Sequence, residues 1–220
     1  MKLSIIIPAL NEASTIQALL EQLPSNDDCE LIVVDGGSTD RTIAIANAYA
    51  RVIQSSPGRA IQMNAGAAIA QGDWLWFLHA DTQIIEPIKN YIDDMAQSDA
   101  LWGRFAVRLD DSRWIFRVIE RFMNGRSCFT SVATGDQGLF VNKRLFDELG
   151  GFPEIPLMED VALSKRLRQV MPLHCSSLCL MTSARRWQQG GVLKTIFLMW
   201  WLRLAYVIGV SPAQLVKWYR

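Results

Sequence analysis

The stretch Leu31-Ile-Val-Val-Asp-Gly-Gly-Ser-Thr-Asp40 decides the fold of this 220-residue chain. Residues 31–34 form a short apolar run that is typical of a buried strand, and Asp35 follows where that strand would end. Two glycines give the turn its conformational freedom, and residues 39–50 then have the pattern of a helix. A strand, a glycine turn and a helix in this order predict one unit of a parallel sheet.

Similar units lie on both sides of this stretch. Strands are predicted at 2–7, 52–54, 74–78, 101–109 and 139–141. Helices are predicted at 14–23, 59–70, 86–97, 114–124, 143–149 and 160–170. Apolar strands that alternate with helices indicate parallel strands covered on both faces. The sequence therefore predicts an α/β fold with a mostly parallel, Rossmann-like sheet flanked by helices.

Length and charge limit the classes of function. A chain of this size suits one α/β domain, which buries about two-thirds of its unfolded surface. The 22 basic side chains balance 22 acidic ones, so no overall field attracts nucleic acid. We therefore expect no nucleic-acid partner, and any recognition of phosphate must be local.

Cysteine usage and the N-terminus predict a cytoplasmic protein. The four cysteines lack the paired spacing of a structural zinc site, so we expect reduced thiols. They are Cys29, Cys128, Cys175 and Cys179. The N-terminal apolar run is interrupted by Pro8 and Asn11, and no cleavage-site pattern follows, so no signal peptide is indicated.

Residues 192–210 are almost wholly apolar. Lys194 and Arg203 lie nine residues apart, on opposite sides of a helix, so the segment has no single polar face. A central Arg costs about 2.5 to 3.5 kcal/mol in a bilayer, so a spanning helix is not expected. Three uses stay open: packing on the domain, homodimer contact, or peripheral contact with the inner membrane face. We predict a domain over 1–190 and an apolar helical segment over 191–220.

Polar residues gather after the predicted strands, where an open parallel sheet binds its ligands. Asn11 and Glu12 follow the first strand, residues 35–40 follow the second, and residues 79–82 follow the fourth. Because the carboxyl ends of parallel strands share one edge of a sheet, we expect these three clusters to meet there.

The turn after Asp35 is a candidate nucleotide site. Asp35 can accept hydrogen bonds from a uracil imide or from ribose hydroxyls, and the backbone at Gly37 and Ser38 can approach a ligand closely. The alternative is a tight turn in which Asp40 caps the helix.

Asp81 is the candidate metal ligand. Two residues before it, His79 lies on the same side of an extended chain. One carboxylate and the diphosphate of a substrate suffice to hold a hard divalent cation, so Mg²⁺ or Mn²⁺ is the expected cofactor. The alternative is a solvated turn in which His79 meets a neighbouring carbonyl.

Charged residues at two predicted helix starts could serve the same site. Arg59 opens the Ala-rich helix, and a guanidinium at a helix N-terminus suits phosphate, although it could equally pair with a surface carboxylate. Asp160 is the first choice for a general base, ahead of Glu159 and Asp136. A helix cap is the alternative for Asp160.

The sequence Arg185-Arg186-Trp187 places two cations beside an aromatic ring. Arg186 could neutralise a departing diphosphate while Trp187 stacks on a sugar face. Contact with a lipid surface is the competing interpretation, because the apolar segment follows directly.

Together these motifs resemble the family 2 glycosyltransferases of the GT-A (nucleotide-diphosphosugar transferase) fold. The resemblance covers about residues 1–190 and rests on motifs in the family's order: 4–12, 35–40, 73–81, 135–138, 150–152 and 159–160.

The resemblance implies an inverting single displacement with a nucleotide-sugar donor. Asp160 would deprotonate the acceptor, and Asp81 would bind the cation on the diphosphate. The residues that would contact the nucleotide-sugar are Pro8, Asn11, Glu12, Asp35, Gly37, Ser38, Arg59, Asp81, Asp136, Arg186 and Trp187.

Two positions depart from the family pattern. Where the family has Asp-x-Asp, this chain has His79-Ala80-Asp81, so one carboxylate carries over. Where processive members have Gln-x-x-Arg-Trp, it has residues 183–187, Ser-Ala-Arg-Arg-Trp, so polymer synthesis does not carry over.

Three further runs, 58–66, 77–82 and 209–212, resemble a compact bacterial subgroup of radical-SAM/selenodomain-associated transferases linked to arsenosugar biosynthesis. The leading hypothesis is transfer of a hexose from a UDP-sugar to a small-molecule or lipid-linked acceptor. The alternative is a nucleotide-sugar-binding or scaffolding protein on the same fold that has lost turnover. A nucleotidyltransferase is disfavoured, because residues 8–12 contain no glycine-rich loop with Arg.

Overall fold

The structure is a computed structural model that describes residues 1–24 and 26–219, except for the side chains of Arg186 and Gln189. The strands are β1 (Leu3–Ala9), β2 (Cys29–Asp35), β3 (Arg51–Gln54), β4 (Trp74–Phe77), β5 (Gln83–Ile84), β6 (Trp102–Leu109), β7 (Phe140–Asn142) and β8 (His174–Thr182). The helices are α1 (Ile16–Leu20), α2 (Thr42–Ala46), α3 (Arg59–Ile69), α4 (Ile88–Gln97), α5 (Trp114–Thr130), α6 (Lys143–Glu148), α7 (Glu159–Val170), α8 (Arg185–Gly190), α9 (Val192–Val207) and α10 (Pro212–Tyr219), with a 3₁₀ turn, η1 (Gly135–Gln137).

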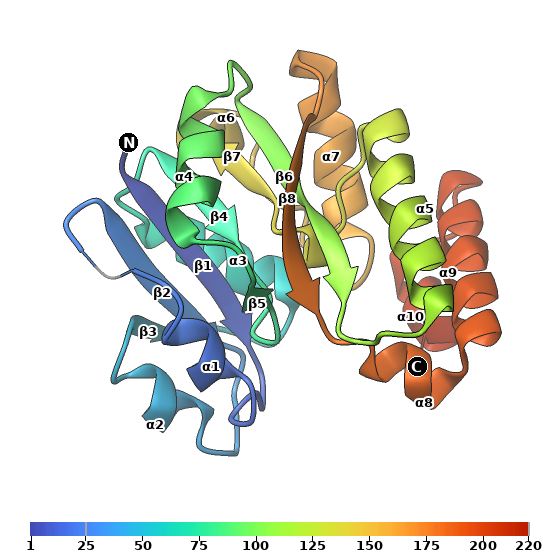
Figure 1. Cartoon of the computed structure of the whole chain (residues 1–220), viewed down its shortest axis with the longest axis horizontal. Helices are drawn as coiled ribbons and strands as arrows, with labels where there is room; N and C mark the ends of the chain where they lie inside the picture. Colours follow the sequence, from blue (N-terminus) through green and yellow to red (C-terminus); the bar gives the residue numbers. More distant parts are fainter. Residues whose placement is uncertain (25, 220) are drawn as a thin grey trace.

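The strands of the described chain form one sheet in the order β3-β2-β1-β4-β7-β6-β8-β5 (Figure 1). Strands β3, β2, β1 and β4 are parallel to one another, as the alternation of strands and helices predicted. The other half is mixed, because β7 runs antiparallel to both β4 and β6, and β5 runs antiparallel to β8. The prediction of a mostly parallel sheet thus describes the first half of the chain, and the whole is a mixed α/β sheet.

Residues of β1 alternate between two hydrophobic layers. Ile5 and Ile7 are fully buried in the layer that contains residues of α1, α2 and α4. Ile6 is fully buried in the opposite layer, with residues of α3, α6 and α7. Because both faces of the sheet are covered, the strand is apolar on both faces over residues 5–7 rather than at every second position.

Some elements differ from those predicted. Helix α5 continues to Thr130, six residues past its predicted end. Strands β5 and β8 and helix α8 were not predicted, and helices α9 and α10 fall inside the predicted helical segment over 191–220. Strand β8 contains the polar run Ser176-Ser177 and lacks a continuous apolar pattern; its position is set by parallel pairing with β6.

The C-terminal apolar segment packs on the rest of the chain with one face. Leu202 and Ala205 of α9 are buried in a cluster with Val132, Met158 and Val161. Within the described chain, no helix combines the length and the apolar character that crossing a bilayer requires. The division of the chain at residue 190 stays a prediction.

The prediction that all four cysteines are reduced thiols is wrong for one pair. Cys128 of α5 and Cys175 of β8 form a disulfide, with their Cα atoms 6.0 Å apart. Cys29 and Cys179 are free. The pair lies 47 residues apart in the sequence, so it was not visible as a local motif. Because Cys128 and Cys175 are not reduced thiols, they do not support the predicted cytosolic location.

We expect Gly66→Ala to lower the free energy of unfolding by about 1 to 3 kcal/mol, because overpacking a tight contact strains it. A Cβ atom at Gly66 would lie 2.5 Å from Cγ2 of Ile6 and 3.0 Å from Cγ2 of Val34. Gly125→Ala is the matched control, because that helical glycine has open space around it, and it should raise stability by about 0.5 to 1 kcal/mol. Urea unfolding measures both; a Gly66→Ala protein as stable as the wild type would contradict the assigned packing of α3.

Candidate active site at the carboxyl edge of the sheet

The loops after β1 and β2 are tied to each other. The backbone N–H of Asn11 donates to Ser38 Oγ at 2.8 Å, and the N–H of Thr39 donates to Asn11 Oδ1 at 2.9 Å. The N–H of Glu12 donates to Thr42 Oγ1 at 2.8 Å. The predicted nucleotide contacts Asn11 and Ser38 therefore already use polar atoms to hold the loops together.

Asp35 keeps one carboxylate oxygen free at this edge. Its Oδ2 accepts hydrogen bonds from the N–H groups of Gly37 and Ser38, at 2.8 and 2.9 Å. Its Oδ1 is buried and has no hydrogen-bond partner among the described residues. Gly37 has a φ of +99° and nothing within 4 Å of where a Cβ would be. Pro8, paired with Val34 in the sheet, is half-buried near the end of β1.

Gln62 of α3 is a positioning residue that the sequence did not identify as part of the site. Its amide nitrogen donates to the carbonyl oxygens of Ala9 and Val34, at 2.9 and 2.8 Å. A Cβ atom at Gly36 would lie 3.1 Å from this amide, so the turn after β2 packs closely against it. Helix α3 is thereby fixed to the ends of both strands.

A cavity of about 1050 Å³ lies beside this edge. Its polar floor contains six side chains from four segments: Arg59, His79, Asp81, Asp136, Glu159 and Asp160. The structure thus brings together the predicted metal ligand, the predicted general base and Arg59. Asn11, Glu12, Asp35 and Ser38 are not among the residues that line this cavity, and they belong to the adjoining loops.

Gly135 joins three parts of this floor. Its N–H donates to Asp160 Oδ2 at 2.9 Å, and a Cβ atom at this position would lie 2.7 Å from His79 Nε2. The N–H of Val161 donates to Asp160 Oδ1 at 2.7 Å. Because β7 is antiparallel to β4, the turn before β7 lies beside the residues that follow β4.

The buried carboxyl groups of the floor hold their protons more tightly than usual. Burial raises the pKa of Asp160 and of Asp81, and the nearby Asp136 carboxylate raises both further. Burial, followed by the charge of Asp160, raises the pKa of Glu159. Oδ1 of Asp136 is buried and has no partner among the described residues. The floor therefore has a surplus of acidic groups that a cation would relieve.

His79 is a neutral imidazole in this environment. Burial, and secondly the charge of Arg59, places its pKa well below the usual range of histidine. Its Nε2 is buried without a partner in the described part of the chain. Arg59 Nη1 lies 3.9 Å from Glu159 Oε1, so the guanidinium faces the floor although it is half-exposed.

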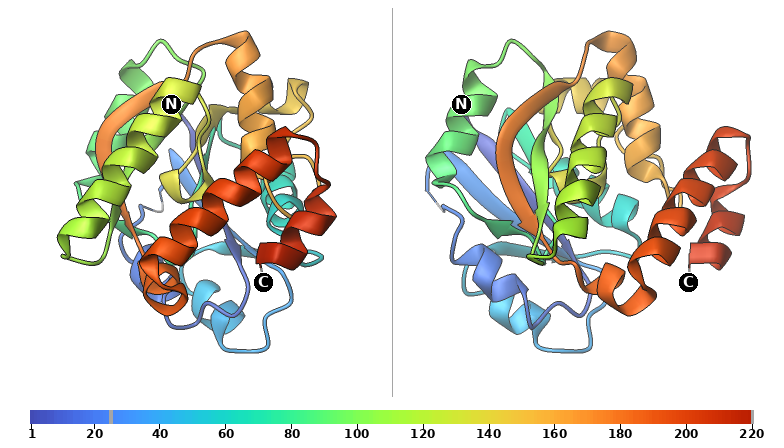
Figure 2. Two further views of the ribbon diagram at one scale, coloured as in Figure 1. Left: turned by 90° about the vertical axis from the view of Figure 1, so that its right-hand side faces the viewer. Right: turned by 45° about the vertical axis from the view of Figure 1, so that its right-hand side comes forward.

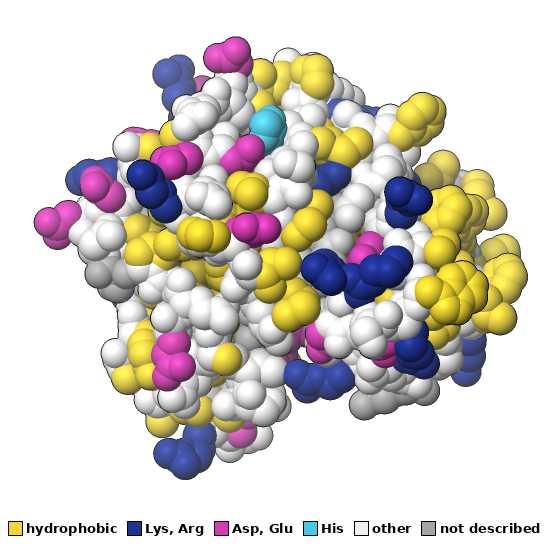
Figure 3. Space-filling model, viewed as in Figure 1, with side chains coloured by type: hydrophobic (Ala, Val, Ile, Leu, Met, Phe, Trp, Pro, Cys, Tyr) yellow, Lys and Arg dark blue, Asp and Glu magenta, His cyan; other side chains and the backbone are white. Residues whose placement is uncertain are grey.

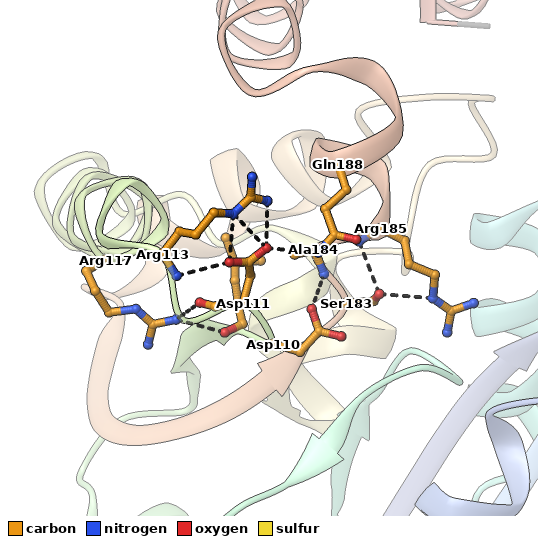
Figure 4. Close-up of polar contacts among 9 residues, drawn as sticks. Asp110, Asp111, Arg113, Arg117, Ser183, Ala184, Arg185 and Gln188 are labelled. Atoms are coloured by element: carbon orange, nitrogen blue, oxygen red, sulfur yellow. Dashed lines mark hydrogen bonds and ion pairs between the residues drawn. The ribbon is translucent and has the colours of Figure 1, made fainter.

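Helix α8 is fastened beside the cavity by the loop after β6 (Figure 4). The N–H of Ala184 donates to Asp110 Oδ1 at 2.6 Å, and Gln188 Nε2 donates to Asp111 Oδ2 at 2.9 Å. Arg185 is exposed, and its Nε donates to Ser183 Oγ at 3.1 Å. Burial raises the pKa of Asp81, and the charge of Arg185 offsets part of that shift. The side chain of Arg186, the predicted contact, lies outside the described residues.

Trp187 packs on a hydrophobic cluster and also lines the cavity. It is half-buried against a cluster that includes Leu109, Phe116 and Ile119, and it also lines the cavity. The predicted stacking of Trp187 on a sugar face is therefore compatible with its place in the fold.

Arg126 was not predicted as a site residue. This side chain of α5 lines the cavity, and its Nε and Nη2 atoms are buried without partners in the described structure. Burial, and secondly the charge of Arg203, lowers the pKa of Arg126 to about 10. No spacing along the sequence pointed to Arg126, since it faces the cavity only because α5 and α9 pack near α7.

Comparisons with known proteins identify the family. Residues 4–150 match the model of Glycosyl transferase family 2. A PGL/p-HBAD biosynthesis glycosyltransferase of Mycobacterium tuberculosis is 32% identical over 166 residues, which is 68% of this chain and 62% of that protein. The chain therefore spans less than two-thirds of the length of that relative.

Two solved structures show the fold. S. aureus TarS in complex with UDP has a TM-score of 0.66 and 18% identity, over 83% of this chain and 60% of that one. Glucosyl-3-phosphoglycerate synthase from Mycobacterium tuberculosis, in complex with Mn²⁺, UDP and glucosyl-3-phosphoglycerate, has a TM-score of 0.60 and 22% identity, over 83% and 70%. The chain thus has the GT-A fold and belongs to glycosyl transferase family 2.

Proposed function

We propose that this chain is an inverting glycosyltransferase that moves a hexose from a UDP-sugar to a hydroxyl group of a small-molecule or lipid-linked acceptor. The observation that carries the proposal is the polar floor of the cavity, where Asp81, Asp136 and Asp160 face Arg59 at the carboxyl edge of the sheet. Two structural neighbours contain UDP, which supports the choice of donor.

The donor nucleotide is assigned to the loops after β1 and β2. Asp35 Oδ1 is the free acceptor for the uracil imide or a ribose hydroxyl, and Gly37 leaves room for the ligand. Pro8, Asn11, Glu12 and Ser38 complete the surface on which the nucleotide rests. Asn11 and Ser38 would contact the nucleotide with fewer free polar atoms, because their side chains already hold the loops together.

The floor fits a divalent cation, Mg²⁺ or Mn²⁺. Asp81 would hold it, and Oδ1 of Asp136, which also lines the cavity, is an oxygen acceptor without a partner among the described residues. No group of three or more His, Cys, Asp or Glu side chains in the described chain could hold a metal alone, which suits a cation that shares its ligands with a diphosphate. When bound, the cation would offset negative charge on the departing diphosphate.

Asp160 is assigned as the general base. It takes the proton of the acceptor hydroxyl, whose oxygen forms a bond to the anomeric carbon. The bond from that carbon to the diphosphate breaks at the same time, and UDP leaves with the electron pair. A raised pKa makes Asp160 a stronger base than an exposed carboxylate, and its two backbone hydrogen bonds fix its direction. Arg59, Arg185 and Arg186 are assigned to the leaving group, and Trp187 to the sugar.

We place the chain in the compact subgroup linked to arsenosugar biosynthesis, on the three sequence runs that resemble it. Several residues of the first run have structural tasks: Asn64 exchanges two hydrogen bonds with the backbone of Phe152, and Gly66 packs on Ile6. We propose that the reaction takes place at the cytoplasmic side, where the chain contacts the inner membrane face peripherally.

Asp81→Ala should remove most of the metal-dependent binding of UDP. With Mn²⁺ present, we expect UDP to raise the melting temperature of the wild type, since a ligand at 100 times its Kd stabilises by about 2.7 kcal/mol. A tenfold loss of affinity would remove about 1.4 kcal/mol of this effect. Thermal shift with and without Mn²⁺ measures it. Asp99→Ala, an exposed carboxylate elsewhere, should behave as the wild type. If UDP raises the melting temperature of Asp81→Ala as much as that of the wild type, the assignment of the cation site is wrong.

Asp160→Asn should lower the slow hydrolysis of UDP-glucose by about 10² to 10⁴-fold, because it removes the general base. The variant keeps the size and shape of the side chain and loses one of its two backbone hydrogen bonds, because the amide NH2 cannot accept. UDP binding in the thermal-shift assay should persist. Release of UDP is the measurement, and Glu154→Gln, on an exposed residue, is the control. If Asp160→Asn hydrolyses the donor at the wild-type rate, the role of Asp160 is wrong; UDP binding without turnover in the wild type would favour the binding-protein alternative.

A further inference from the structure

The cavity continues from its polar floor into an apolar lobe between α5 and α9. Three side chains that line this lobe are themselves strongly exposed: Phe122 is 68% exposed, Phe129 93% and Trp200 68%. A wall residue that is also on the surface marks the mouth of a cavity. The lobe therefore opens on the face of the molecule formed by α5 and α9.

A pair of arginines lies in the same cavity. Arg126 and Arg203 are close enough for the charge of Arg203 to lower the pKa of Arg126, and Asp136 and Asp160 act on Arg126 in the opposite direction. Nε and Nη2 of Arg126 nevertheless donate to no described residue. A buried guanidinium with unused donors has lost water without gaining a partner, which is a costly arrangement. An anionic group of a ligand would complete it.

The face around the mouth is apolar along both helices. Along α9 and at the residue that follows it, large hydrophobic side chains are exposed at intervals of three or four residues: Leu193, Phe197, Trp200, Leu204 and Ile208. On α5 the same spacing exposes Trp114, Val118 and Phe122. Both helices, with α10, lie toward the viewer in the left panel of Figure 2, and hydrophobic side chains gather at the corresponding edge in Figure 3. We call this surface the α5–α9 face.

The charge of the chain is divided along the sequence. Asp160 is the last acidic residue, so residues 161–220 contain no Asp or Glu and nine Lys or Arg. Residues 1–160 contain the 22 acidic residues and the other 13 basic ones, because 22 minus 9 leaves 13. The part of the chain that forms α8, α9 and α10 is thus strongly basic in a protein of zero net charge.

An anionic lipid surface fits this combination better than a second copy of the chain. Four of the eight tryptophans are exposed on helices α5, α9 and α10, and indole side chains favour the boundary between headgroups and acyl chains. Basic side chains beside them attract anionic headgroups. In a symmetric dimer, the same basic segments would face each other and repel.

We propose that the α5–α9 face rests on an anionic bilayer and that the lobe takes the acceptor from it. The acceptor is then an amphiphile with an anionic group near its hydroxyl. Its hydrocarbon chain lies in the lobe, and its anionic group meets Arg126 and Arg203. The identity of the acceptor rests on the proposed function, whereas binding to vesicles and to an anionic amphiphile does not require turnover.

Co-sedimentation with vesicles tests the surface. The wild type should bind vesicles of phosphatidylglycerol and phosphatidylcholine, bind pure phosphatidylcholine less, and lose affinity as salt screens the charges. Phe197→Ser combined with Ile208→Ser should weaken binding about tenfold or more, because two exposed apolar side chains are removed. Neither residue lines the cavity. The matched control is Leu101→Ser combined with Val170→Ser, which removes exposed apolar side chains from other elements and should bind as the wild type.

Two outcomes would overturn the docking proposal. One is failure of the wild type to bind anionic vesicles, or equal losses in the two double variants. The other is a wild-type dimer in light scattering that Phe197→Ser with Ile208→Ser converts to a monomer, which would assign the face to a second copy.

Calorimetric titration with decyl phosphate tests the arginine pair. The wild type should bind decyl phosphate more tightly than decanol, and Arg126→Met should weaken decyl phosphate binding about tenfold by removing charged hydrogen bonds. The variant is expected to fold, since two of the three guanidinium nitrogens of Arg126, Nε and Nη2, have no described partner, and its melting temperature checks this. Arg203→Met is the second variant. Arg144→Met, on an exposed side chain of α6, should bind as the wild type.

If the wild type binds decyl phosphate and decanol with equal affinity, the proposed contact between an anionic group and the two arginines is wrong. If Arg126→Met instead loses UDP binding and keeps decyl phosphate binding, the arginine serves the donor diphosphate, and the acceptor assignment is wrong. If the wild type binds decyl phosphate but shows no glycosyl transfer, the proposed subsite is supported and the proposed function is wrong.

Discussion

The buried amide of Gln62 connects the two regions on which the site depends. It donates hydrogen bonds to the carbonyl oxygens of Ala9 and Val34, near the ends of β1 and β2, and the oxygen of Ala9 also accepts from the N–H of Gly36. A buried amide that loses its partners costs about 1 to 3 kcal/mol, so these two hydrogen bonds fix α3 to the strands. The first residue of the same helix, Arg59, then reaches 3.9 Å from Glu159 at the start of α7. One helix thus sets the distance between the nucleotide loops and the acidic floor.

The floor combines segments that approach from opposite directions. His79 and Asp81 follow β4, which is parallel to β1, whereas Gly135 precedes the antiparallel strand β7. The lack of a side chain at Gly135 lets its N–H reach Asp160 while His79 packs against it. Burial raises the pKa values of Asp81 and Asp160, and the nearby Asp136 carboxylate adds to this; backbone hydrogen bonds and the surrounding arginines offset only part of the effect. Such an arrangement costs stability and is typical of a site built to receive charged ligands.

The C-terminal helices have a different relation to the core. One face of α9 is buried with Val132, Met158 and Val161, next to the general-base candidate, and the other face is exposed and apolar. The same helix therefore forms a wall of the cavity and part of the outer surface. Because α9 lies both beside Asp160 and at the surface, a ligand or membrane that covers the α5–α9 face would lie next to the proposed general base.

The sequence by itself determined the parallel half of the sheet and the main acidic residues of the site. Apolar runs, glycine turns and helix starts are local features, so β1 to β4 could be predicted, as could the position of Asp81 after a strand and of Asp160 at the start of a helix. The antiparallel place of β7, the pairing of β8 with β6 and the Cys128–Cys175 disulfide were decided by tertiary structure, because they join distant residues. Tertiary structure also decided the positions of Arg126, Gln62 and the apolar lobe. Periodicity shows that a helix has an apolar face, but only packing decides which part of that face is covered and which side chains point into the space that is left.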